Sequence, residues 1–404
     1  MRANLKKPTV RANLKKPAVR ANLKERTVAE PDPGADVKRA LWGSRAPWGF
    51  RALWGFRALL ALCFLCSGEA LRAQETTFFV ELSETAAAEI AELGLEVPVT
   101  GRVYVVLAPQ DGDREPRSQV GIQGVPFWGR AVEGMAAGQR VSLVPGGSGV
   151  IGHPLEDLSE VPPGTYRAQA FLNVFTTFHR ADGHVVRMHM NSGAGQSPWR
   201  APGNAYGPPR TVTVGPSGDR TVSLVVDQVI PPTHPVPQGG SMQQGNPTDR
   251  GELVRFVKIR SDVLSEFWGQ DMYIGANILL PAGYADEPDR RYPVLYSTGH
   301  FPGERAPFSY SDEGGEGRGR SAGFSEFWRS EDAPEIIVVS VRDANPYYDT
   351  GHSVNSVNVG PYGDAFIDEL IPHLEEEFRI VPEPWARVLA GGSTGGWEAL
   401  AIQI

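Results

Sequence analysis

The stretch RVLAGGSTGGW, residues 387–397, carries the clearest signal in this 404-residue chain. A short apolar run leads into a serine that lies between glycines, and a helix-forming stretch, residues 397–401, follows. This is a G-x-S-x-G pattern in the strand–turn–helix setting that presents a nucleophilic serine. The sequence therefore predicts that Ser393 is a nucleophile at the top of a strand.

The residues around Ser393 fit this chemistry. A serine hydroxyl is a weak nucleophile, so a base must take its proton. Gly391 and Gly395 leave room for a bend in which larger side chains would collide. The N–H of Thr394 is expected to donate to the oxyanion that forms on the attacked carbonyl. The alternative is a glycine-rich helix N-terminus that only binds an anion.

A second oxyanion donor is expected in the loop that follows the third strand of such a domain. That loop contains His300 and Phe301, whose backbone N–H groups are the candidates. A plain turn with a solvated His300 is the alternative.

The base is harder to find. In this fold an acid and then a histidine follow the serine, but no histidine follows Ser393 in this sequence. His300, His352 and His373 all precede it. His373 is expected to be structural or exposed, and His352, in a loop after a buried strand, is a remote candidate for a replacement base. The sequence thus predicts a chain without the acid and histidine of a triad.

The N-terminus differs from the rest. Residues 1–56 contain the basic repeats RANLKKP and RALWG, which indicate a low-complexity leader or a start codon placed too early. A nucleic-acid or membrane arm is the alternative. Residues 57–73 combine a basic flank, an apolar stretch of about ten residues and a small residue, Ala73, which is typical of a secretory signal peptide. The stretch is too short for a membrane span, which needs about 20 apolar residues.

Signal cleavage would change the chain's character. It would remove both cysteines and leave no thiol for a disulfide, a nucleophile or a metal. Residues 1–73 hold 15 Lys and Arg against 5 Asp and Glu, so 24 basic and 42 acidic residues remain, a formal charge of −18. So acidic a protein would repel nucleic acid. We therefore expect a secreted or periplasmic protein without nucleic-acid partners and without stable membrane insertion.

Residues 75–230 are predicted to form a β-sandwich of the immunoglobulin-like kind, because short apolar strands alternate with Gly, Pro and Asp turns. Residues 211–214 and 221–226 suggest a hairpin around a Gly-Pro-Ser-Gly turn, and residues 84–95 a short helix or a loop. A linker rich in Pro and Gly is expected at residues 231–250.

Residues 251–404 show a different pattern. Apolar strands are expected at 253–259, 272–280, 293–296, 335–340 and 387–390. An amphipathic helix at 362–379 has apolar residues every three or four positions, and a further helical stretch lies near 321–328. This alternation predicts part of an α/β-hydrolase domain with a mostly parallel sheet.

Metal or cofactor binding has little support in the sequence. The eight histidines show neither H-x-x-x-H nor H-E-x-x-H spacing, and no phosphate-binding loop with Lys-Ser/Thr is present. His184 and His189 lie five apart in a strand-like region and are expected at the surface. We therefore predict no metal site and no cofactor.

Residues from about 252 to 404 resemble the putative esterase family of α/β-hydrolases, which includes enterochelin-esterase-like and feruloyl-esterase-like proteins. Four stretches carry the resemblance: YPVLY (292–296), VNS with GPYGDA (354–365), ELIP (369–372) with FR (378–379), and GGSTGGWE (391–398). A preceding all-β domain is also similar to enterochelin-esterase-like proteins.

The resemblance implies a serine-dependent carboxylic ester hydrolase that forms an acyl-enzyme on Ser393. Tyr347, Tyr348 and Asn355 would border the pocket for a small-molecule or carbohydrate-linked ester. The family's acid and histidine lie in a C-terminal part that this sequence lacks, so we expect a C-terminally truncated, nearly inactive chain. The alternative is a non-catalytic exported protein that binds carbohydrate or cell wall and carries a degenerate hydrolase scaffold.

Overall fold

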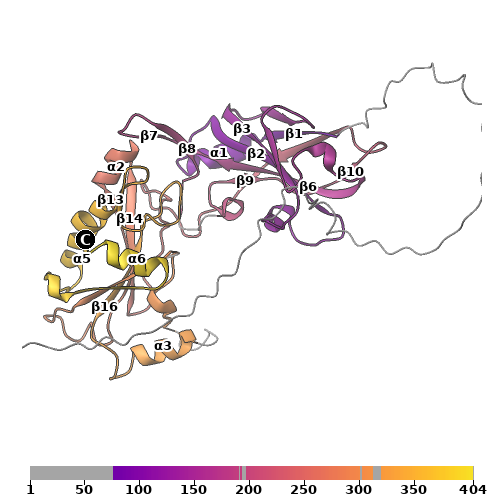
Figure 1. Cartoon of the computed structure of the whole chain (residues 1–404). Coiled ribbons are helices and arrows are strands. Elements are labelled where there is room, and N and C mark those ends of the chain that lie inside the picture. The colour runs from indigo at the N-terminus through magenta and orange to yellow at the C-terminus, as the bar shows by residue number, and fades with distance from the viewer. Residues whose placement is uncertain (1–75, 191, 193–196, 301–302, 313–319, 404) are drawn as a thin grey trace, which may run out of the picture. The chain divides into compact units, whose positions relative to one another are not determined.

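The computed structural model describes residues 76–403, except residues 191, 193–196, 301–302 and 313–319. The predicted basic leader, signal peptide and both cysteines lie outside the described residues. Two clusters of buried side chains organise the described part. One involves most of the first twelve strands, and the other involves the last strands and helices together with a small hairpin of residues 176–188. Figure 1 shows the first group from indigo to magenta and the second from orange to yellow.

Two sheets share the first cluster. One sheet has the order β11-β1-β4, with β1 (Thr77–Leu82), β4 (Arg140–Leu143) and β11 (Thr221–Val226). The other has the order β12-β9-β6-β2-β3-β5, and β10 also pairs with β6. Its strands are β2 (Val99–Pro109), β3 (Phe127–Met135), β5 (Val150–His153), β6 (Gly164–Val174), β9 (Ala205–Tyr206), β10 (Arg210–Val214) and β12 (Gln228–Val229).

Alternation of buried and exposed residues explains why these strands pair as they do. In β1 the side chains of Phe78, Val80 and Leu82 are buried, and their neighbours are more exposed. Side chains of the second sheet, among them Val103 and Trp128, join the same core. The predicted sandwich strands are thus present, and the immunoglobulin-like assignment stays a prediction. β1 and β11 run parallel to each other, which is uncommon in antiparallel sandwiches.

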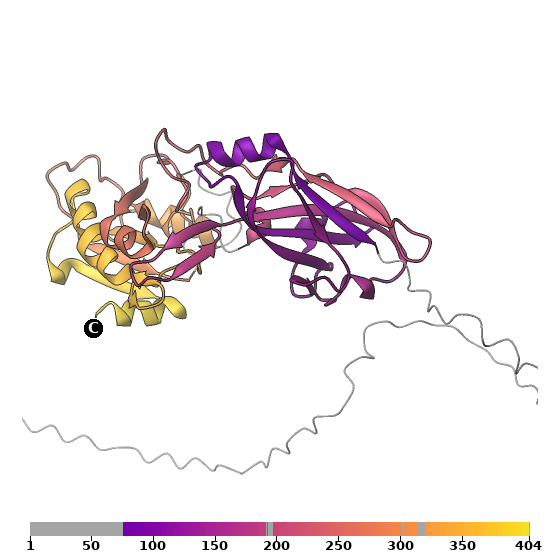
Figure 2. The same ribbon diagram turned by 90° about the horizontal axis from the view of Figure 1, so that it is seen from above.

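The segment after β1 is a helix, α1 (Glu84–Glu92). Ser83 caps it, because its hydroxyl accepts a hydrogen bond from the N–H of Ala86 at 3.0 Å. Ala86, Ala87 and Ile90 are buried against the strands, and Figure 2 shows α1 running along their outer side.

The predicted hairpin of residues 211–214 and 221–226 is wrong. Both strands form, but β10 pairs with β6 and β11 pairs with β1, in the other sheet. The turn between them is present, since the N–H of Gly218 donates to the carbonyl of Gly215 at 2.9 Å. The chain crosses here from one sheet to the other, which a local pattern cannot distinguish from a hairpin.

The second cluster surrounds a five-stranded sheet of order β13-β14-β16-β15-β19. Its strands are β13 (Val254–Ser261), β14 (Met272–Leu279), β15 (Val294–Thr298), β16 (Ile337–Arg342) and β19 (Arg387–Gly391). Each predicted strand is therefore present.

The expectation of a mostly parallel sheet is not confirmed, because two of the four strand pairings are antiparallel. β13 pairs antiparallel with β14, and β14 with β16, whereas β15 pairs parallel with both β16 and β19. The link from β13 to β14 is a two-turn helix, α2 (Asp262–Trp268), with a few residues beyond it. A parallel crossover needs a dozen or more residues, so the chain turns back on itself there.

The amphipathic helix predicted at 362–379 is present in three parts. They are α4 (Tyr362–Asp364), the π-helical segment η5 (Ala365–Leu370) and α5 (Ile371–Glu377). Phe366, Leu370 and Leu374 are fully buried, as their spacing predicts. The remaining helices are α3 (Arg320–Trp328) and α6 (Thr394–Ala401). No helix of the described residues has the length and apolar character needed to cross a membrane.

A small hairpin from the first half of the chain joins the second core. It consists of β7 (Thr176–His179) and β8 (Val185–Met188). The Phe178 ring packs edge-on against Trp268 of α2, with centroids 5.1 Å apart, and the N–H of Ala181 donates to the carbonyl of Phe267 at 2.9 Å. Residues 231–249 contain neither helix nor strand, and the domain division expected there stays a prediction.

The hairpin contact yields a stability prediction. Phe178→Ala should lower the free energy of unfolding by about 3–5 kcal/mol, because it opens a cavity in a core that includes Trp268. Val185→Ala, an exposed position on the partner strand, should change it by less than about 0.5 kcal/mol. Urea titration followed by tryptophan fluorescence measures both, and equal midpoints for the two variants would contradict the assignment.

Candidate active site

Ser393 occupies the bend between β19 and α6. Its backbone has φ 55° and ψ −123°, outside the region that non-glycine residues ordinarily adopt. The carbonyl of Ser393 accepts the N–H of Gly396 at 3.1 Å and of Trp397 at 3.3 Å, so the helix begins directly after it. The residue is exposed. Strain of this kind persists only where the surroundings impose it, and it concentrates at functional sites.

Two glycines make the bend possible. A Cβ on Gly395 would lie 2.1 Å from the carbonyl oxygen of Thr298, and one on Gly391 would lie 2.3 Å from the carbonyl carbon of Gly395. Neither distance is compatible with a side chain. The hydroxyl of Thr298 donates to the carbonyl of Gly395 at 2.6 Å and ties the first turn of α6 to the end of β15. The bend therefore requires residues without a side chain at Gly391 and Gly395, as the sequence predicts.

The predicted oxyanion donors lie near this bend. Thr394 is the first residue of α6, where helix N–H groups have no partner within the helix. The loop with Gly299 and His300 leaves β15 beside the bend, since the same missing Cβ of Gly395 would lie 3.0 Å from the amide nitrogen of Gly299. Phe301 lies outside the described residues. The oxyanion roles of Thr394, His300 and Phe301 stay predictions.

A histidine–carboxylate pair beside the bend is a feature that the sequence reasoning missed. Nδ1 of His352 lies 2.8 Å from Oε1 of Glu398, whose side chain is only 3% exposed. Burial raises the pKa of Glu398, and the hydrogen bond with His352 opposes that rise. Glu398 lies five positions after Ser393, and the only advance signal was a charged residue inside an otherwise apolar helix.

The backbone around His352 is held by a buried acid. His352 and Ser353 both have left-handed conformations, with φ of 58° and 48°. Asp343, 1% exposed at the end of β16, accepts hydrogen bonds from the Thr350 hydroxyl at 2.8 Å and from the Ser353 N–H at 2.8 Å. The Thr350 hydroxyl in turn accepts the N–H of His352 at 3.0 Å. This network fixes where the imidazole can lie.

His300 completes a cluster with His352, Asp349 and Glu398, which we call the imidazole–carboxylate cluster. The two imidazole rings lie 5.8 Å apart, and Nε2 of His300 is 4.0 Å from Oδ1 of Asp349. Burial raises the pKa of Asp349, and the nearby imidazoles of His300 and His352 oppose that rise. Two loops and one helix thus bring these four side chains together, and the helix is the one that begins after Ser393.

The residues expected to border the substrate pocket make other contacts. The ring of Tyr347 packs 5.9 Å from Trp268, and Tyr348 is exposed beside it. The amide of Asn355 donates to the Asp364 carboxylate at 2.7 Å and accepts the Asp364 N–H at 3.1 Å, which anchors α4. The structure gives these three residues local roles, and their contact with substrate stays a prediction.

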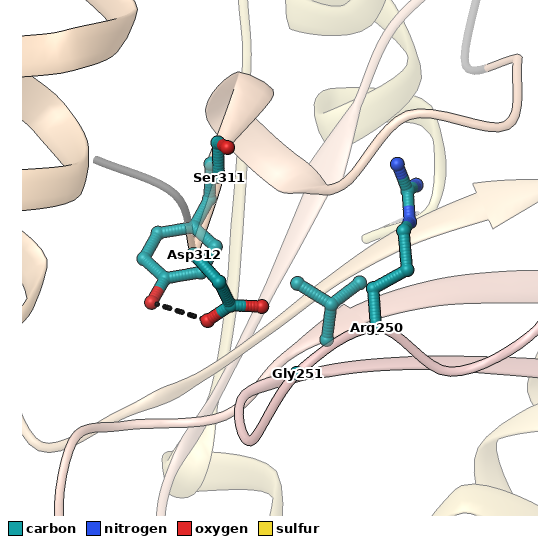
Figure 3. Close-up of a pocket in the computed structure, with 6 residues that line it drawn as sticks. Arg250, Gly251, Ser311 and Asp312 are labelled. Atoms are coloured by element: carbon teal, nitrogen blue, oxygen red, sulfur yellow. Dashed lines mark hydrogen bonds between the residues drawn. The ribbon is translucent and has the colours of Figure 1, made fainter. Parts of the chain in front are cut away.

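A separate hollow of about 530 Å³ lies elsewhere on the same sheet. Arg250, Gly251, Val254, Tyr310, Ser311 and Asp312 line it, and Figure 3 shows the hydrogen bond from Tyr310 to Asp312. Val254 pairs with Leu279, which in turn pairs with Val338 at the start of β16. The hollow therefore lies at the end of the sheet where the parallel strands begin. Ser393 follows the far end of the parallel strands, so this hollow is not its pocket.

The charged side chains do not form a metal site within the part of the chain that the structure describes, where no three His, Cys, Asp or Glu residues are suitably grouped. His373 is paired with Glu377 at 2.9 Å on the surface of α5. His184 is exposed beside Asp182, whereas burial lowers the pKa of His189, so the expectation that both lie at the surface is wrong for His189.

The glycine contacts yield a matched test. Gly395→Ala should destabilise the protein by at least about 1–3 kcal/mol, because its methyl group would overlap the backbone of Thr298. Gly392→Ala should be tolerated, since a Cβ there meets nothing within 4 Å. Thermal unfolding of the two variants checks this, and similar melting temperatures would contradict the described bend.

Part of the chain is similar to known esterases. Residues 267–404 match the model of the family described as Putative esterase. A solved ferulic acid esterase is 21% identical over 37% of this chain and 54% of its own, with a TM-score of 0.25. A thermostable esterase is 13% identical over 80% of this chain and 73% of its own, with a TM-score of 0.22.

The chain therefore spans about half the length of the ferulic acid esterase, and both structural likenesses are too low to support an argument. A search of curated proteins gave no match. The family match is therefore the finding that bears on this region: residues 267–404 are similar to the family described as Putative esterase.

Proposed function

We propose that the protein is a carboxylic ester hydrolase that reacts through an acyl-enzyme on Ser393. The observation that carries the proposal is the strained, exposed Ser393 between β19 and α6, with glycines where side chains would collide. The match of residues 267–404 to an esterase family supports the same reaction.

In the proposed reaction, the Ser393 hydroxyl attacks the ester carbonyl while its proton passes to a base. The N–H of Thr394 and an N–H in the loop after β15 stabilise the oxyanion. The alcohol then leaves, and water hydrolyses the acyl-enzyme to release the acid. The substrate is a small-molecule ester, with carbohydrate-linked esters as one class. The proposed location is outside the cytoplasm, from the acidic sequence and the predicted signal peptide.

Ser393→Ala tests the proposal. Hydrolysis of a chromogenic short-chain ester by the full chain should fall to the residual rate that binding and the oxyanion donors alone support, and a fluorophosphonate should no longer label the protein. Ser311→Ala, an exposed serine at the distant hollow, should retain both signals. Mass spectrometry should place the label of the unmodified chain on Ser393.

Labelling of Ser393 and cleavage of the ester are quantified separately in this assay. Labelling of another serine, or ester cleavage at an unchanged rate in Ser393→Ala, would refute the proposal.

A further inference from the structure

We propose that residues 241–246 act as a clamp that holds the loops after β15 and β16 in one arrangement. This segment, which we call the glutamine plug, lies within residues 231–249, which contain neither helix nor strand. Both loops leave the sheet at the carboxyl ends of parallel strands, the end at which Ser393 follows β19. The clamp concerns the rigidity of this end of the sheet and not the ester reaction.

The glutamine plug is buried although its sequence is polar. Met242, Gln243 and Gln244 are 5%, 6% and 2% exposed. A connecting segment rich in Pro and Gly is ordinarily found at the surface. Buried polar side chains need hydrogen-bond partners, so both glutamine amides must be satisfied within the protein.

The amide of Gln244 extends the sheet beyond its last strand pair. The pairing of β14 with β16 ends at Gly275 and Arg342. Continuing its register would place Tyr273 opposite Ala344, but Gln244 bonds to both of them instead. Its Nε2 donates to the carbonyls of Ala344 at 2.6 Å and Tyr273 at 3.2 Å, and its Oε1 accepts the N–H of Ala344 at 3.2 Å. Gln244 therefore holds the beginning of the loop after β16 against β14.

Gln243 makes the equivalent contacts at the start of β14. Its Nε2 donates to the carbonyl of Asp271 at 2.7 Å, and its Oε1 accepts the N–H of Tyr273 at 3.2 Å. The two amides thus take the place of a neighbouring strand on this side of β14. Loss of either amide would leave buried main-chain groups without partners, which is strongly unfavourable.

Lys258 of β13 binds the main chain of the plug. Its ammonium donates to the carbonyls of Ser241 at 2.7 Å and Gln243 at 3.0 Å, and to the side-chain oxygen of Asn246. Burial, together with the nearby charge of Arg342, lowers the pKa of Lys258 to about 8. The side chain is therefore still charged at neutral pH, and hydrogen bonds from a charged donor are strong.

Arg342 of β16 binds the same main chain from the other side. Its guanidinium donates to the carbonyl of Gln244, and to that of Val257 on β13 at 3.0 Å. Arg342 and Lys258 are both opposite Gly275, so two like charges lie close together on one face of the sheet. The carbonyl oxygens of the plug offset this repulsion. Release of the plug would leave both cations without these acceptors, which is costly for a buried charge.

The plug also contacts the loop after β15. Gly245 has a φ of 68°, and a Cβ there would lie 1.6 Å from Oε1 of Glu304. The Glu304 carboxylate lies 3.2 Å from Nε2 of His234, which precedes the plug. Arg250, which follows the plug, donates to the Glu304 carbonyl at 3.0 Å. The plug and its flanking residues therefore hold this loop at three points.

Lys258 distinguishes a clamp from ordinary local packing. Its three described side-chain hydrogen bonds all go to the plug. If the plug holds both loops as one unit, a change at Lys258 loosens both of them. If each loop is held by its own contacts, a change at Lys258 loosens neither.

Hydrogen exchange of the full chain at pH 7 tests the clamp. Lys258→Met and Gln244→Ala should each raise amide exchange about 10–100-fold in residues 303–310 and 344–350, which both contain hydrogen-bonded N–H groups. Amides of β2 and β6 should keep their rates, because these strands belong to the other core. Gln238→Ala, at an exposed glutamine before the plug, should leave every rate unchanged.

Three results would overturn the clamp. They are unchanged exchange in both loops of Lys258→Met, a rise in only one loop, and an equal rise in β2 and β6, which would make the plug a part of the general core. The measurement requires no ester hydrolysis, so its outcome is independent of the labelling of Ser393 on which the proposed function depends.

Discussion

The approach of the Gly395 backbone to Thr298 is the constraint on which the site depends. The first turn of α6 lies so close to the end of β15 that no side chain fits between them, and the Thr298 hydroxyl bonds the Gly395 carbonyl. This contact sets the direction in which α6 leaves the sheet. It thereby places Ser393 in its strained conformation and determines where Trp397 and Glu398, one turn further on, meet the loop of His352.

One short helix, α6, positions both Ser393 and Glu398. Ser393 precedes its first turn, and Glu398 in its second turn is buried beneath His352. Because a helix is stiff over this length, the spacing between the serine and the acid is fixed by local geometry. The partner loop is fixed separately by Asp343 at the end of the neighbouring β16, so the imidazole and the serine are positioned from two strands of one sheet.

Local patterns were sufficient to predict the five strands of the second sheet, the strands at 211–214 and 221–226, the long helix and the bend at Ser393, because each depends on neighbouring residues. Pairing between distant strands was not predictable in this way. The sequence of β10 and β11 is typical of a hairpin, yet they join different sheets, and β13 and β14, which the short α2 links, pair antiparallel. The His352–Glu398 pair was missed for the same reason, since 46 positions separate its members and only the folded chain brings them together.

The hairpin of β7 and β8 limits how easily the strands of the first core and the sheet of the second core could be separated in evolution. Its Phe178 fills space beside Trp268, and Arg180 lies 4.7 Å from the centre of the Phe267 ring while donating to the carbonyl of Val357. A recombination event that joined residues 253–403 to an unrelated neighbour would uncover an aromatic surface on α2. Such an exchange would therefore succeed only if the incoming neighbour supplied an equivalent aromatic side chain, which ties the inheritance of residues 267–404 to that of the strands before them.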